Sequence, residues 1–238
     1  MQTKTRNETR NVKLYTCMSI ESEERKKIYY ALFFPVIICL LIILVFVFEQ
    51  GMGLDFHEAG VFPRELKTLP HIFTMPFIHA DWSHLLNNIV SFFVLSSCLY
   101  YFYSPIANKV ILLSVILSGF LLWIIGRDNW HIGASGIIFA LSFFLFFSGL
   151  LRKHVPLIAI SFIVVFLYGN NVWHLFPWQK MDPVSWEGHL SGGIIGVLLA
   201  FIFRKKGPQK PVKIWEEDEN ADSQDEYWKN DIPEEEND

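Results

Sequence analysis

The sequence predicts an all-α integral membrane protein, a bundle of six transmembrane helices with both termini in the cytoplasm. Apolar residues make up 52% of the 238-residue chain and charged residues 18%, against about 45–50% and about 25% in an average soluble protein. Most of the charged side chains fall in residues 1–28 and 204–238. The stretch between them is too apolar to cover the surface of a soluble fold, which excludes a soluble enzyme and a disordered chain.

Six apolar runs lie in this middle stretch, and each has or approaches the roughly 20 residues that cross a hydrocarbon core. None contains Asp, Glu, Lys or Arg. In chain order they are Tyr29–Phe48, His84–Tyr103, Val110–Gly126, Gly133–Leu151, Val155–Val172 and His189–Phe203. The fifth run is interrupted by Pro156 and Asn170–Asn171, and the sixth is short. Because none shows the period-two alternation of barrel strands, we expect helices.

The first run is expected to remain in the protein as a spanning helix. A basic start followed by an apolar run is also typical of a signal peptide, but this run is about 20 residues long and has no small-residue cleavage site. With both termini inside, the inner side carries fifteen Lys and Arg residues, plus Lys229 far along the tail, and the outer side carries four, at positions 64, 67, 127 and 180. This bias predicts the orientation, because basic residues favour the cytoplasmic side.

The chain is expected to divide into a core and two tails. Residues 1–28 form a basic cytoplasmic tail, residues 29–203 the six-helix core, and residues 204–238 a second cytoplasmic tail, first basic and then acidic. Residues 216–238 contain one Lys and twelve acidic residues, a composition typical of disorder. Cys17, Cys39 and Cys98 lie far apart, and no disulfide framework is expected.

Polar side chains gather where the second, fourth and sixth helices enter from the outer side. Before the second helix, Asp81 is a candidate N-cap, so that the helix begins at Trp82. His84 and Asn88 then lie four residues apart on one face. The fourth helix enters through Gly133-Ala-Ser135-Gly136, and the sixth through Gly188-His189 followed by Gly192 and Gly196. The alternating direction of the helices places all three groups at one depth, below the outer surface.

Nucleophilic catalysis is the chemistry that these residues favour. A serine hydroxyl such as that of Ser135 needs a base to take its proton, and His189 is the candidate base. The spacing of Gly192 and Gly196 lets the sixth helix pack closely on the fourth, which carries His189 toward Ser135. His84, Asn88 and the Ser135 backbone N–H are then candidate donors to an oxyanion. The alternatives are a helix-packing face, an interfacial histidine, and hydrogen bonds that only join helices.

Other chemistries lack their residues. No His-Glu-x-x-His zinc motif and no phosphate-binding loop occur, and the six runs contain no acidic pair for an aspartyl protease. We therefore expect no metal, no cofactor and no nucleic-acid partner. A proton-coupled transporter with His84 and His189 as relays is a further alternative, but transporter sites lie at the midplane rather than near one surface.

Three motifs in order resemble the rhomboid family of intramembrane serine proteases over about Leu54–Phe203. They are His79-x4-His84-x3-Asn88, Gly133-Ala-Ser135-Gly136 with Phe139 one turn later, and Gly188-His189-x2-Gly192-x3-Gly196. The resemblance implies a rhomboid-like bundle with Ser135 as nucleophile, His189 as base, and His84, Asn88 and the Ser135 N–H as the oxyanion hole. It also implies that His79 supports the first outer loop and that Phe139 stacks on the histidine.

The resemblance further implies membrane-protein substrates, chiefly single-pass proteins cut near their outer end, and the lipid bilayer as the other partner. It favours a multi-pass protein of a bacterial cytoplasmic membrane whose active site opens to the outer side. Many relatives carry Trp-Arg where this chain has Pro70-His71, which leaves the anchoring of the first outer loop open. A non-proteolytic rhomboid-like protein that only binds membrane clients is the alternative within the family. His71 and His131 are expected to be ordinary loop residues.

Overall fold

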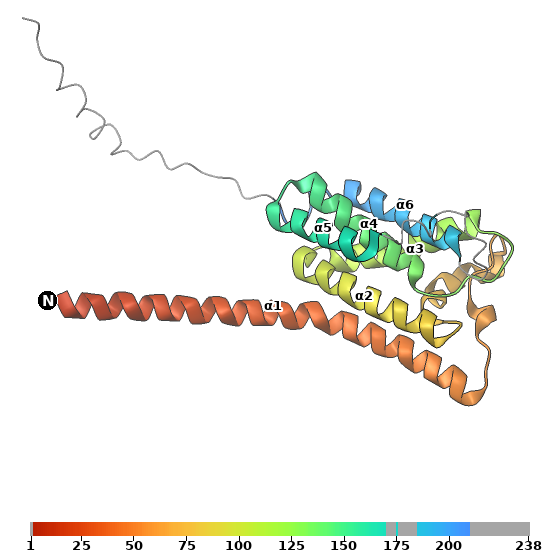
Figure 1. Cartoon of the computed structure of the whole chain (residues 1–238), viewed down its shortest axis with the longest axis horizontal. Coiled ribbons are helices and arrows are strands. Elements are labelled where there is room, and N and C mark those ends of the chain that lie inside the picture. The colour runs from red at the N-terminus through yellow and green to blue at the C-terminus, as the bar shows by residue number, and fades with distance from the viewer. Residues whose placement is uncertain (1, 170–174, 176–184, 210–238) are drawn as a thin grey trace, which may run out of the picture.

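The fold, in the computed structural model, is a bundle of helices (Figure 1). The structure describes residues 2–169, 175 and 185–209, with side chains from residue 22 onward. Its α-helices are α1 (Gln2–Met52), α2 (Trp82–Tyr103), α3 (Ala107–Ile125), α4 (Ser135–Arg152), α5 (Val155–Tyr168) and α6 (Trp186–Ile202). Three short 3-10 helices, η1 (His57–Ala59), η2 (Leu66–Phe73) and η3 (Met75–Phe77), lie between α1 and α2. In the described part no strand forms, apart from an isolated bridge between Val61 and His131.

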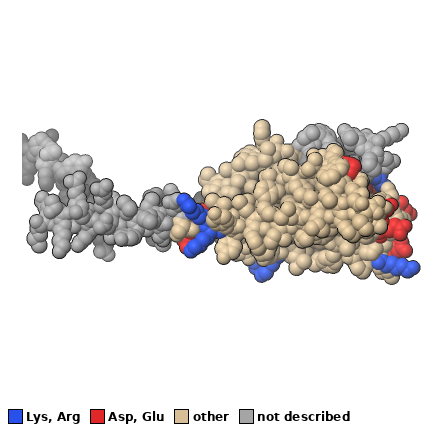
Figure 2. Space-filling view, turned by 90° about the horizontal axis from the view of Figure 1, so that it is seen from below, with Lys and Arg blue, Asp and Glu red and all other residues tan. Residues whose placement is uncertain are grey.

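Four helices are long and apolar enough to cross a membrane: α2, α3, α4 and the Ser22–Met52 part of α1. The helices α5 and α6, with 14 and 17 residues, are apolar but shorter. On the face seen in Figure 2, the charged side chains of the described part lie mainly toward its two ends, and few lie between them. The predicted end of the fifth run at Val172 and the acidic tail 216–238 fall outside the described residues.

The helix α1 is much longer than the apolar run that predicted it, since it begins at Gln2 rather than near Tyr29. Residues 2–28 contain neither Pro nor Gly and are rich in Glu, Lys and Arg, which favour helix. Lys26 and Lys27 pair with Glu23 and Glu24 one turn earlier. The basic segment is therefore a continuation of the helix, and it extends beyond the bundle (Figure 1).

The helix α4 occupies the centre of the bundle, packed against α2, α3, α5 and α6. Within their spanning windows, 61% of α4 is buried, against 28–39% in α1, α2 and α3. On one side Gly149 allows α5 to approach closely, and Ser161 of α5 donates a hydrogen bond to the Phe146 carbonyl (2.9 Å). A central α4 explains how residues at its first turn meet residues of both α2 and α6.

The helices α2, α4 and α6 begin at the same end of the bundle, beside the 3-10 helices (Figure 1). The predicted N-cap of α2 is confirmed, because the Asp81 carboxylate accepts the His84 N–H at 2.9 Å. The helix α6 has its own cap, the Ser185 hydroxyl, which accepts the Gly188 N–H at 3.1 Å. The starts of these three helices bring the polar clusters of the sequence to one end of the fold.

Candidate active site

A glycine seam joins α6 to α4, as the sequence spacing predicted. A Cβ added at Gly192 would overlap the carbonyl oxygen of Gly136, and one added at Gly196 would overlap that of Ala140. Such separations are far inside contact distance, so only glycine permits this approach of the two backbones. Gly193, one residue from the seam, would meet only ordinary contacts at 3.5 Å or more. The close approach is therefore specific to the face of α6 that carries His189.

His189 lies in the first turn of α6 and Ser135 is the first residue of α4. The imidazole is 7% exposed and lies flat on the Phe139 ring, with centroids 4.3 Å apart and planes 14° apart. Phe139 follows Ser135 by about one helical turn. The stack thus holds the imidazole against Phe139, about one turn along α4 from the half-buried Ser135.

His84 and Asn88 of α2 face the loop that leads into α4. A Cβ at Gly133 would lie 2.8 Å from the His84 ring and 3.6 Å from Asn88 Nδ2. Gly133 also has φ +102°, a backbone conformation that excludes most side chains. Asn88 is buried, and its Nδ2 has no hydrogen-bond partner within the described residues. The Asn88 amide is therefore available as a hydrogen-bond donor next to Gly133, which lies two residues before Ser135 in the sequence.

His79 lies in the loop before α2 and is 2% exposed. Its ring contacts that of His84 edge to face, with centroids 4.9 Å apart. Burial, together with the neighbouring His84, lowers the pKa of His79 from 6.5 to about 4. His79 is therefore neutral at neutral pH and packs behind His84.

A narrow pocket opens between α3, α4 and the start of α6, and Ser135 lies in its wall. The cavity has a volume of about 10 Å³, which is about the space that one water molecule needs. Its lining residues are Met75, Ser118, Leu122, His131, Ile132, Gly133, Ser135, Gly136, Ser185 and Gly188.

The segment between α1 and α2, which was expected to form the first outer loop, is anchored mainly by residues other than Pro70-His71. Arg64 donates a hydrogen bond to the Gly126 carbonyl (2.6 Å) and pairs with Asp128. Trp123 of α3 donates to the Glu65 carbonyl (3.0 Å). His71 contributes one contact, from Nδ1 to the Gly60 carbonyl (2.9 Å). The segment is thus held mainly to the C-terminal end of α3.

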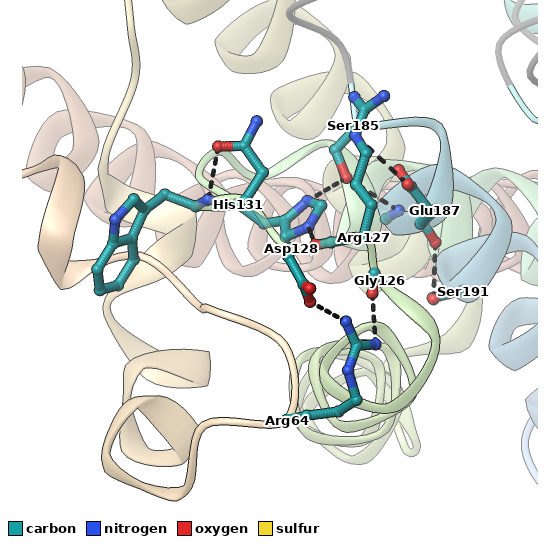
Figure 3. Close-up of polar contacts among 11 residues, drawn as sticks. Arg64, Gly126, Arg127, Asp128, His131, Ser185, Glu187 and Ser191 are labelled. Atoms are coloured by element: carbon teal, nitrogen blue, oxygen red, sulfur yellow. Dashed lines mark hydrogen bonds and ion pairs between the residues drawn. The ribbon is translucent and has the colours of Figure 1, made fainter.

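A cluster of polar side chains that the sequence did not predict lies around the start of α6 (Figure 3). His131 is 2% exposed, and its Nδ1 lies 2.7 Å from the Ser185 hydroxyl. Arg127 pairs with the buried Glu187 (Nε to Oε1, 3.4 Å). His131 does lie in the loop between α3 and α4, but it is buried and joined to the start of α6, which the sequence did not predict. The available signal was Ser185 three residues before Gly188, with Glu187 in the first turn, a pattern typical of a helix N-terminus.

Comparison with known proteins gives the same family as the motifs. The sequence model of the Rhomboid domain matches residues 67–206. Uncharacterized proteins of Mycobacterium tuberculosis and Mycobacterium leprae are each 32% identical to this chain over 68% of its length, and the matches cover 70% and 67% of those proteins. Rhomboid-related protein 1 of Caenorhabditis elegans is 26% identical over 60% of this chain and 46% of its own length.

Proposed function

This chain belongs to the rhomboid family, and we propose that it is an intramembrane serine endopeptidase with Ser135 as nucleophile and His189 as base. The observation that carries the proposal is the glycine seam together with the Phe139 stack. The seam lets α6 approach the first turn of α4, and the stack fixes the His189 ring there. A serine and a histidine held on two rigid, closely packed helices provide a nucleophile beside its base.

In the proposed reaction, Ser135 Oγ attacks the carbonyl carbon of the scissile peptide while the His189 ring takes the hydroxyl proton. The carbonyl oxygen becomes an oxyanion, which accepts hydrogen bonds from Asn88 Nδ2, from His84 and from the Ser135 backbone N–H. The intermediate then collapses. The C–N bond breaks, the leaving amine takes the proton from His189, and an acyl ester remains on Ser135. Water hydrolyses this ester by the same steps, with His189 again as base.

The unpartnered amide of Asn88 supports this assignment. A buried donor without an acceptor costs free energy, about 1–3 kcal/mol. An oxyanion formed next to Gly133 supplies the acceptor, so that the cost is recovered only as the reaction proceeds. A donor satisfied in the transition state and not before favours a faster chemical step over tighter substrate binding.

The proposal includes six spans with both termini in the cytoplasm, in a bacterial cytoplasmic membrane. The helices α5 and α6 are shorter than the usual span, and we count them as the fifth and sixth. The start of α6 and the site then lie just below the outer surface. Expected substrates are single-pass membrane proteins whose helices unwind easily near that surface, where peptide bonds and water reach Ser135 together.

The test uses full-length protein in liposomes with a model single-pass substrate. Ser135→Ala and His189→Ala are each expected to abolish cleavage without loss of folding, because a nucleophile and its base act as one unit. A fluorophosphonate probe should label the wild type but not Ser135→Ala. Mass spectrometry of the labelled peptide identifies the modified serine.

Matched controls are Ser142→Ala, two turns further along α4, and His71→Ala in the outer loop. Both should cleave at the wild-type rate. Cleavage that persists in Ser135→Ala would exclude the dyad. A folded wild type that binds the substrate without cutting or labelling would instead support the client-binding alternative.

A further inference from the structure

We propose that His131 is a positioning residue of the site: its hydrogen bond to Ser185 fixes the start of α6 against the entrance to α4 and so aligns His189 with Ser135. This inference rests on the proposed function. It assigns a role to a buried histidine that takes no part in the reaction described above.

His131 joins three segments of the chain. Its backbone exchanges hydrogen bonds with Val61 of the first outer loop, at 2.8 and 3.0 Å. Its ring Nε2 lies 3.2 Å from the Arg127 carbonyl, and Nδ1 lies 2.7 Å from the Ser185 hydroxyl. The backbone bonds to Val61 do not depend on the side chain at position 131. The connection of His131 to α6 is therefore made by its ring, through Ser185 (Figure 3).

The directions of these hydrogen bonds follow from the groups involved. A carbonyl oxygen only accepts, so Nε2 of His131 carries the proton and donates it to the backbone carbonyl of Arg127. Burial lowers the pKa of His131 and favours the neutral ring. In that ring Nδ1 is an acceptor, and Ser185 donates its hydroxyl proton to it. The Ser185 oxygen meanwhile accepts the Gly188 N–H, so one chain of hydrogen bonds runs from Arg127 through His131 into the first turn of α6.

The spacing of the residues ties this link to the dyad. Ser135 lies four residues after His131, and His189 lies four residues after Ser185. The link therefore joins the two segments four residues before each reactive side chain, just ahead of the first turns of α4 and α6. His131 and Ser185 also line the same pocket as Ser135. A shift of α6 by about 1 Å at this point would misalign the dyad, and such a misplacement can cost about a hundredfold in rate.

A second contact acts on the same turn. Arg127 pairs with Glu187, which lies in the first turn of α6 where a carboxylate is favoured by the helix dipole. This ion pair and the lower glycine seam should keep α6 in place when the His131 link is removed. Loss of the hydrogen bond between His131 and Ser185 is thus expected to disturb the alignment of His189 with Ser135 more than the stability of the fold.

The experiment compares His131→Phe, which keeps a ring of similar size without nitrogen atoms, with His131→Asn, whose Oδ1 can accept from Ser185 in place of Nδ1. Ser185→Ala and Ser185→Thr form the matching pair on α6. His131→Phe and Ser185→Ala should each lower kcat about 10- to 100-fold with KM within about twofold, and slow fluorophosphonate labelling of Ser135 in parallel. Asn and Thr should restore most of the rate. The double variant should lose less rate than the two single effects combined, because both changes remove the shared bond between His131 and Ser185.

His71→Phe is the control, since it removes a histidine contact to the Gly60 carbonyl in the segment between α1 and α2, away from α6. Rates are normalised to folded, monodisperse protein, and Ser185→Ala serves if His131→Phe folds poorly. If both variants keep the wild-type kcat and labelling rate with only a lower Tm, the positioning role is wrong while the proposed protease stands. If the wild type itself neither cleaves nor labels, the proposed function fails and this inference with it.

Discussion

At the scale of single residues, His79 next to the site is a histidine that is buried in its neutral form. His79 has a pKa of about 4 because burial, and then His84, disfavour its charged form. Its ordinary pKa is 6.5, so between these values the unfolded chain binds a proton that the folded protein does not. The contribution of neutral His79 to the stability of the folded protein is therefore complete above about pH 6.5 and is lost as the pH falls toward 4.

We expect the Tm of the detergent-solubilised protein to fall between pH 7 and pH 4.5. A shift of this size corresponds to about 3 kcal/mol at its limit. His79→Gln cannot charge, so its Tm should fall less steeply over the same range, while His57→Gln in the outer loop should follow the wild type. Parallel curves for the wild type and His79→Gln would show that other groups control the acid sensitivity.

At the scale of the helices, the contact between α4 and α6 determines how His189 is placed relative to Ser135. A Cβ at Gly196 would overlap the Ala140 carbonyl and would lie 2.8 Å from the Phe143 Cβ. Backbone atoms cannot move aside as a flexible side chain can, so the helices must separate. Overpacking of this kind costs about 1–3 kcal/mol.

We expect Gly196→Val to abolish proteolysis and to lower the Tm. The branched side chain pushes α6 from α4 about two turns below His189, and a small displacement there is enough to misalign the dyad. Gly193→Ala is the matched control, because its Cβ would meet only ordinary contacts, and it should remain active. Full activity in Gly196→Val would mean that α6 reaches the nucleophile by another packing.

At the scale of the whole molecule, the charge pattern and the helix directions place the site at one end of the bundle. Figure 2 shows charged groups at both ends of the face in view and few between. In a cysteine-free background, made by replacing Cys17, Cys39 and Cys98, a cysteine at Glu58 should react with an impermeant thiol reagent added outside intact cells. One at Gln209 should react only after the cells are opened, and the reverse pattern would invert the orientation.

Local and periodic features of the fold could be predicted from the sequence. The Asp81 cap, the glycine spacing on α6 and the position of Phe139 depend on residues one or two turns apart, so their geometry follows from helix parameters. The extension of α1 was missed because hydropathy finds the spanning part of a helix and not its polar continuation. The link from His131 to Ser185 was missed for a different reason: it joins two non-periodic segments that are 54 residues apart.

The separation of the two proposed catalytic residues has a consequence for biosynthesis. Ser135 lies on α4 and His189 on α6, so 54 residues must be added after the nucleophile before the base exists. At about 5–20 residues per second, the nascent chain spends about 3–11 s in the membrane with a serine that has no base. The proposed proteolytic activity would therefore begin only when α6 has inserted and packed on α4.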